Sequence, residues 1–259
     1  MYVLSQRGSY RLTKKKMTIQ KPKAVFAWSG GKDSSYCLNQ VLEDNEYEVV
    51  YLLTTMNAEF KRISMHGVRE ELLDLQSESI GIPQLKVWIY EASNEAYERQ
   101  MEEMLLKAKS EGIEHVIFGD IFLEDLRTYR ENNLAKVGMK AVFPLWKKDT
   151  SELIQSFINK GFKTVTCCIN DARLDESWVG KEIDQDFIKD LPVTVDPCGE
   201  NGEYHTFCYA GPIFKKEIQI KVGEKLYKPL VIKTNDDSCG GAVAEIKTKG
   251  FWFCELEKL

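Results

Sequence analysis

The chain has 259 residues and a formal net charge of -5 at pH 7, and its length allows one large domain or two small ones. A hydrophobic content of 43% beside 29% charged residues is typical of a globular protein with a substantial core. The negative charge argues against nucleic acid as a partner, and no apolar run approaches the roughly 20 residues that span a membrane. The seven cysteines form no C-x-x-C pair, so we expect a cytoplasmic protein with reduced thiols and no structural metal.

The first regular segment is expected after an amino-terminal extension over residues 1–21. The extension lacks the apolar stretch of a secretory signal, so we expect it to be flexible. Residues 23–28 form a short apolar run that predicts one buried strand. Tyr36, Leu38 and Val41 recur at helical spacing and predict a helix from residue 33 or 34.

The turn between this strand and helix, S-G-G-K-D-S, has the composition of an anion site. Its glycines allow positive φ and let a ligand approach the backbone, while the helix start directs N–H groups at the same point. The candidate binding residues are Ser29, Gly30, Gly31, Lys32, Ser34 and Ser35. The turn is shorter than a P-loop, G-x-x-x-x-G-K-[ST], and Asp33 follows the lysine. We expect the side chains of Lys32 and Asp33 to pack against nothing at this open turn.

Strands and helices alternate over the next hundred residues. Strands are predicted at 48–55, 85–90, 115–120 and 141–146, and helices at 68–79, 94–110 and 122–138. This alternation predicts right-handed βαβ units and a doubly wound, Rossmann-like parallel sheet.

The pattern changes near residue 150, which divides the chain into a domain over 22–150 and a smaller α+β domain over 151–259. A helix at 152–159 and a strand at 164–169 precede a polar, irregular stretch with one further helix. Short antiparallel strands are then expected at 217–223, 230–234 and 250–256. The last of these, GFWFCEL, is apolar and is a candidate for a homodimer contact.

Candidate site residues follow the ends of the predicted strands. In open α/β sheets ligands bind at the carboxyl ends of the strands, which favours Gly119 and Asp120 as binding residues. Arg127 lies one helical turn from Glu124, so it either binds a ligand or belongs to a solvated helix face with ion pairs. His66 is more typical of a loop or cap residue, and it is of interest only because the first crossover can lie over a bound nucleotide.

The segment DPCGENGEYHT, residues 196–206, crowds glycines, glutamates and a histidine together. Glu200 and Glu203 could position a substrate amine, or hold a loop by accepting backbone N–H bonds. Cys198 is not an obvious nucleophile, since no base lies at a fixed distance from it in the sequence.

The six-residue turn resembles the PP-loop of N-type ATP pyrophosphatases. With GDI…LEDLR, LDESWVGKEID and CGENGEYHTF…GPIF in that order, the chain resembles the diphthine–ammonia ligase family over roughly residues 22–214. The resemblance implies a PP-loop domain that binds ATP, and a carboxyl-terminal domain for substrate and ammonia. It implies that a carboxylate is adenylated, that pyrophosphate is released, and that ammonia displaces AMP. Lys32, Asp33, Glu200, Glu203 and His205 are then the expected catalytic residues, and Asp33 the expected ligand of Mg2+.

Two departures from the family pattern concern the acceptor. Archaeal and eukaryotic members usually read E-G-G-E-[YF]-E-T where this chain has Asn201 and His205, and Lys181 stands where arginine is common. The variant is similar to bacterial members, and bacteria lack diphthamide. The carboxylate acceptor, a small molecule or a protein-borne group, therefore stays open, as does the source of ammonia.

Three alternatives use the same loop. The chain could be an amidating enzyme of cobamide (B12) salvage, which is also amide chemistry. It could be a sensor that holds ATP or AMP without chemistry, although the glutamate-rich segment argues against this reading. RNA sulfuration or lysidine-type modification is disfavoured by the negative charge and by the lack of paired cysteines.

Overall fold

The computed structural model describes residues 20–64, 66–90, 93–230 and 249–259. The predicted extension lies almost entirely outside the described residues, and so does the predicted strand at 230–234 apart from Leu230.

The first half of the chain forms a parallel sheet in the order β4-β2-β1-β5-β6. Its strands are β1 (Lys23–Ala27), β2 (Glu48–Asn57), β4 (Gln84–Ile89), β5 (His115–Ile117) and β6 (Lys140–Val142). A two-residue strand, β3 (Arg62–Ile63), pairs antiparallel with the end of β2. The chain moves outward from β1 to β4 and then returns to place β5 on the other side of β1. This order confirms the predicted doubly wound sheet and places a topological switch point between β1 and β5.

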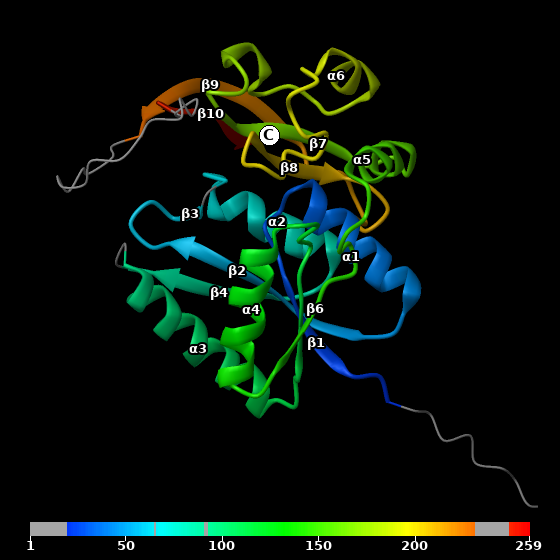
Figure 1. Ribbon diagram of the computed structural model, residues 1–259, viewed down its shortest axis with the longest axis vertical. Coiled ribbons are helices and arrows are strands. Elements are labelled where there is room, and N and C mark those ends of the chain that lie inside the picture. The colour runs from blue at the N-terminus through cyan, green and yellow to red at the C-terminus, as the bar shows by residue number, and fades with distance from the viewer. Residues whose placement is uncertain (1–19, 65, 91–92, 231–248) are drawn as a thin grey trace, which may run out of the picture.

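Helices cover both faces of the parallel sheet (Figure 1). On one face lie α1 (Lys32–Asp44) and α2 (Glu70–Ile80), whose buried side chains join one hydrophobic core with Phe26. On the other face lie α3 (Asn94–Ser110) and α4 (Glu124–Lys136), which pack in a second core around Val25 and Val116. Apolar residues at helical spacing create each buried face, because only one side of each helix meets the sheet.

The second half of the chain forms an antiparallel sheet in the order β8-β7-β10-β9. Its strands are β7 (Lys163–Asn170), β8 (Tyr204–Ala210), β9 (Ile220–Pro229) and β10 (Gly250–Lys258), and its helices are α5 (Thr150–Asn159), η1 (Glu176–Trp178) and α6 (Gln185–Asp190). Figure 1 shows this sheet lying over α1 and α2, with α6 on its far side. Leu38, Phe207 and Cys254 belong to a single core, so the two sheets share a continuous apolar interior. The division near residue 150 remains a proposal.

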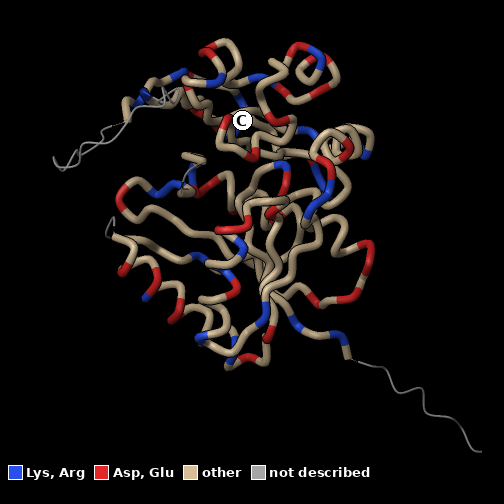
Figure 2. Tube along the Cα trace, viewed as in Figure 1, with Lys and Arg blue, Asp and Glu red and all other residues tan. Residues whose placement is uncertain are grey.

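The predicted apolar strand GFWFCEL forms most of β10, which is an inner strand paired with both β7 and β9. A homodimer contact through it remains a prediction. Both signs of charge are interspersed along the elements in Figure 2, and six cysteines of the described part of the chain are buried free thiols. No helix within the described ranges is long and apolar enough to cross a membrane.

Candidate active site

The S-G-G-K-D-S loop connects the carboxyl end of β1 to the start of α1. Gly30 adopts the expected positive φ, at 76°, whereas Gly31 is extended with φ -91° and caps the helix. The hydroxyl of Ser29 donates to that of Ser34 over 3.1 Å and accepts from the Gly31 N–H over 3.3 Å. Ser35 is turned inward, because its hydroxyl donates to the Gly31 carbonyl oxygen over 2.8 Å. The hydroxyls of Ser29, Ser34 and Ser35 thus all form hydrogen bonds within the loop.

The buried side chain of Gln76 on α2 holds this loop through hydrogen bonds. Its amide nitrogen donates to the carbonyl oxygens of Gly30 (2.9 Å) and Cys208 (2.6 Å), and its oxygen accepts from the Trp28 indole over 3.0 Å. Sequence reasoning missed Gln76. The available signal was its position on the buried stripe of α2, beside Leu72 and Leu73, where an amide needs buried partners.

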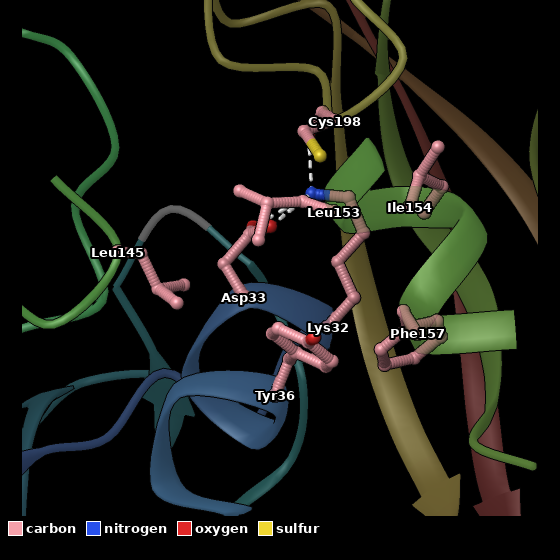
Figure 3. Close-up of a pocket in the computed structure, with 8 residues that line it drawn as sticks. All are labelled: Lys32, Asp33, Tyr36, Leu145, Leu153, Ile154, Phe157 and Cys198. Atoms are coloured by element: carbon pink, nitrogen blue, oxygen red, sulfur yellow. Dashed lines mark hydrogen bonds and ion pairs between the residues drawn. The ribbon is translucent and has the colours of Figure 1, made fainter. Parts of the chain in front are cut away.

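The side chain of Lys32 is buried, with 3% of its surface exposed. Its ammonium group donates to both carboxylate oxygens of Asp33, over 2.7 and 2.6 Å, and to the carbonyl oxygen of Cys198. Figure 3 shows its aliphatic stem in a small pocket lined by Asp33, Tyr36, Leu145, Leu153, Ile154, Phe157 and Cys198. The expectation that Lys32 packs against nothing is therefore wrong, because α5 and the Cys198 turn cover it. Burial alone would lower the pKa of Lys32, but the Asp33 carboxylate together with Cys198, Tyr204 and Glu200 raises it above its ordinary value.

Three carboxylates, those of Asp33, Asp120 and Glu200, line one cavity of about 820 Å³ at the switch point. Asp120 forms an ion pair with Arg130 at 2.7 Å, and the Arg130 guanidinium lies over the Phe118 ring at 4.3 Å. Burial raises the pKa of Asp120, and the charge of Asp33 raises it further against the opposing effect of Arg130. Burial and the charge of Asp33 likewise raise the pKa of Glu200 to about 8. The cavity thus brings three carboxyl groups together beside the loop, two of which, Asp33 and Asp120, are paired with the cations Lys32 and Arg130.

The two glutamates of the 196–206 segment have different surroundings. Glu203 is 1% exposed, and its carboxylate accepts from the N–H groups of Asp196 (3.1 Å) and Asn201 (2.9 Å) and from the Asn201 side chain (3.2 Å). Of the two glutamates, only Glu200 is among the residues that line the cavity. The structure thus favours the loop-holding alternative for Glu203 and leaves Glu200 facing the ligand space.

The end of this segment docks directly onto the loop. The hydroxyl of Thr206 accepts from the Lys32 N–H over 2.9 Å, so β8 caps the first turn of α1. His205 lines the cavity, and its ring lies 4.7 Å from the His66 ring. Burial lowers the pKa of His205 to about 3, and the neighbouring His66 and Lys32 contribute to this shift. Near neutral pH its imidazole is therefore uncharged.

Two further expected residues lie in different places. Gly119 lines the cavity, and a Cβ there would approach the Asp33 carbonyl oxygen to 3.3 Å, so the end of β5 packs closely on α1. Arg127 packs over Phe143 and Trp146, at 5.0 and 4.6 Å, and pairs with Glu131 over 2.8 Å. It is not among the residues that line the cavity, so its role in nucleotide binding remains an untested prediction.

A glycine-lysine loop at the carboxyl end of the first strand, beside the switch point of a parallel sheet, defines an α/β nucleotide-binding protein of PP-loop type. Comparison with known protein families identifies one family within this class of nucleotide-binding proteins. The family described as "Diphthamide synthase N-terminal domain" matches residues 22–141, and "Diphthamide synthase C-terminal domain" matches residues 149–234. The chain belongs to the diphthamide synthase family, as the sequence motifs predicted.

Individual relatives share about a quarter of their residues with this chain. Diphthine–ammonia ligase from Bos taurus is 26% identical over 219 residues, which cover 76% of this chain and 82% of that protein. The human diphthine–ammonia ligase is 25% identical with the same coverage, and the Danio rerio protein is 26% identical over 76% of this chain and 85% of its own. The U34-tRNA thiolase NcsA from Methanococcus maripaludis, a solved structure, covers 54% of this chain and 56% of its own at 16% identity. The TM-score of this match is 0.33.

Proposed function

We propose that this chain is an ATP-dependent ligase that joins ammonia to a carboxylate as an amide. The observation that carries the proposal is a single cavity that joins the PP-loop to the 198–206 segment, with Lys32 and Asp33 on one wall and Glu200 on another. The family match and the names of the relatives support the proposal, since those proteins are called diphthine–ammonia ligases.

ATP is the first substrate. The Gly31 and Lys32 N–H groups already donate to Ser29 and Thr206. We infer that the phosphates lie at the N–H groups of Asp33 and Ser34 and at the hydroxyls of Ser29 and Ser34, near the positive end of α1. Ala27 at the end of β1 and its pairing partner Leu53 in β2 give the cavity an apolar surface, which suits a nucleoside base. An oxygen of the acceptor carboxylate then attacks the α-phosphorus, and pyrophosphate leaves. The fixed charge of Lys32 stabilises the charge that develops on the phosphates.

Mg2+ fits the donors of this cavity. No group of three or more His, Cys, Asp and Glu side chains in the described part of the chain is arranged to hold a metal ion by itself. Mg2+ is commonly bound by one or two carboxylates together with substrate phosphates, and Asp33 offers such a carboxylate, 31% exposed. Glu200 lines the same cavity and offers a further carboxyl oxygen. Asp33 would hold the ion, which would neutralise phosphate charge.

Ammonia is the second nucleophile. It attacks the acyl carbon, and AMP leaves with one oxygen of the former carboxylate. Glu200, whose pKa is about 8, can take a proton from ammonium in its ionised form, which becomes the main form above about pH 8. Glu203 holds the segment that presents Glu200, and neutral His205 adds an uncharged polar group to the same wall.

The test is a product assay with ATP, Mg2+, ammonium chloride and candidate carboxylates, among which diphthine comes first because the relatives are named for it. We expect AMP and pyrophosphate, formed only when acceptor and ammonium are both present. Asp33→Asn should abolish the reaction, while Asp44→Asn, an exposed aspartate at the other end of α1, should not. ADP and phosphate as main products would contradict the proposal.

A further inference from the structure

His66 connects the PP-loop to the antiparallel sheet. It lies in the connection between β3 and α2, and its Nδ1 is 3.1 Å from the Thr206 carbonyl oxygen. A Cβ on Gly31 would lie 3.1 Å from its Cε1, so the ring rests directly on the loop. His66 also lines the large cavity, beside His205.

The contact with Thr206 determines which ring nitrogen carries hydrogen. A carbonyl oxygen only accepts, so Nδ1 must be the N–H that donates to it. Burial lowers the pKa of His66, against smaller opposing effects of the Thr206 bond and Asp33, and keeps the ring neutral near pH 7. A neutral imidazole has one N–H, so Nε2 carries a lone pair that can accept a hydrogen bond.

The loop that carries His66 is held by the last strand. Arg62 donates to the Gly67 carbonyl oxygen over 2.7 Å and pairs through its other terminal nitrogen with Glu255 of β10. Arg69 donates to the second oxygen of Glu255 over 3.1 Å. Gly67 has φ 70°, and a Cβ there would lie 3.0 Å from the Phe253 ring. Because Glu255 binds both arginines, it fixes the backbone next to His66.

We propose that Nε2 of His66 accepts a hydrogen bond from the ammonium ion that supplies the amide nitrogen, and that Glu255 positions the ring through Arg62. The proposal rests on the proposed function and names the binding group for its nitrogen substrate. A lone pair at this position repels phosphate oxygens and suits an N–H donor. Asp33, whose side chain is 31% exposed, and Glu200 line the same cavity and offer further oxygen acceptors to an ammonium ion.

The first test needs no acceptor and no turnover. Histidine-15N-labelled protein is titrated with ammonium chloride and, separately, with tetramethylammonium chloride, a cation without N–H groups. We expect the free protein to show the Nδ1–H tautomer of His66, and the Nε2 signal to shift saturably with ammonium alone. An Nε2–H tautomer, an equal response to both cations, or no response would each overturn the proposal.

Matched variants separate this role from a structural one. In His66→Gln an amide oxygen lies near the position of Nε2, whereas His66→Asn retains only a donor near the position of Nδ1. The KM for ammonium should therefore be about tenfold higher in His66→Asn than in His66→Gln. Glu255→Gln should raise that KM by about tenfold with the KM for ATP unchanged. Glu257→Gln, which removes an exposed pair with Lys221 on the same strand, should change neither constant. Equal KM values for ammonium in Glu255→Gln and Glu257→Gln would remove the positioning role.

The proposed function can fail separately from this inference. Its failure would appear as ADP among the products, or as no pyrophosphate release at any ammonium concentration. Failure of the His66 assignment would instead leave pyrophosphate release intact and ammonium binding unchanged in His66→Asn.

Discussion

Glu203→Gln tests whether the 196–206 segment is a scaffold that presents Glu200. The Glu203 carboxylate is 1% exposed and accepts three hydrogen bonds, from the N–H groups of Asp196 and Asn201 and from the Asn201 side chain. Glutamine keeps one acceptor oxygen and turns its amide group toward at least one of these donors. A buried donor without an acceptor costs about 1–3 kcal/mol. At about 2–4 °C per kcal/mol for a chain of this size, the melting temperature should fall by about 2–12 °C.

The matched control is Glu200→Gln, the same chemical change three positions earlier in the same segment. Within the described ranges no residue donates a hydrogen bond to the Glu200 side chain, which lines the cavity, so the melting temperature should not fall. Both variants should amidate slowly, but ATP affinity, measured by calorimetry, should be retained in Glu200→Gln. If Glu203→Gln has the melting temperature of the wild type and still amidates slowly, Glu203 does not act by holding the 196–206 segment.

Three other substitutions test the electrostatics and packing of the loop. The difference in melting temperature between Glu200→Gln and the wild type should shift in favour of the variant as pH rises from 4.5 toward about 8. In this range Glu200 stays protonated in the folded wild type but ionises in the unfolded chain, so the wild type loses stability and the variant does not. A difference that does not change with pH would contradict the raised pKa of Glu200. Lys32→Met should lower both turnover and melting temperature, since the buried ammonium has its partners in the fold, and an unchanged melting temperature would show that it is not held as described. Gly31→Ala places a Cβ 3.0 Å from the Thr206 carbonyl oxygen, so kcat should fall roughly tenfold to a hundredfold through displacement of the loop; near-normal kcat would contradict a close fit between loop and β8.

The parallel half of the fold was predictable because its signals are local. Helix α3, Asn94–Ser110, has the predicted bounds, set by the Ser93 cap, whose side chain accepts from the Ala96 N–H, and by Gly112 just after its end. β1 and β2 are short apolar runs, as expected of strands buried on both faces. Strand β8 was not predicted. It is buried along nearly its whole length and shows no alternation, and its place is set by pairing with β7 and by contacts with α1 that are distant in sequence.

In the candidate site, too, features with a local sequence signal could be predicted, and features set by contacts distant in sequence could not. The S-G-G-K-D-S loop could be found because all its donors are adjacent in the chain. The burial of Lys32 could not, because its carbonyl partner, Cys198, lies 166 residues away. The different roles of Glu200 and Glu203 depend on a single turn, which decides which carboxylate meets backbone N–H groups and which meets the cavity. His66 carries no local signal, since Thr206 and the Glu255 network act on it only in the folded chain.

The central claim is that a carboxylate is activated as its adenylate in the cavity between the PP-loop and the 198–206 segment. In the adenylate, one oxygen of the former carboxylate bridges the acyl carbon and the α-phosphorus. When ammonia displaces AMP, this oxygen leaves with AMP. The acceptor, with diphthine tried first, should therefore be labelled with 18O in its carboxylate, allowed to react with ATP, Mg2+ and ammonium, and the nucleotide product examined by mass spectrometry. We predict one 18O atom in each AMP formed and none in pyrophosphate. Label found in inorganic phosphate, or AMP formed without label, would contradict the account.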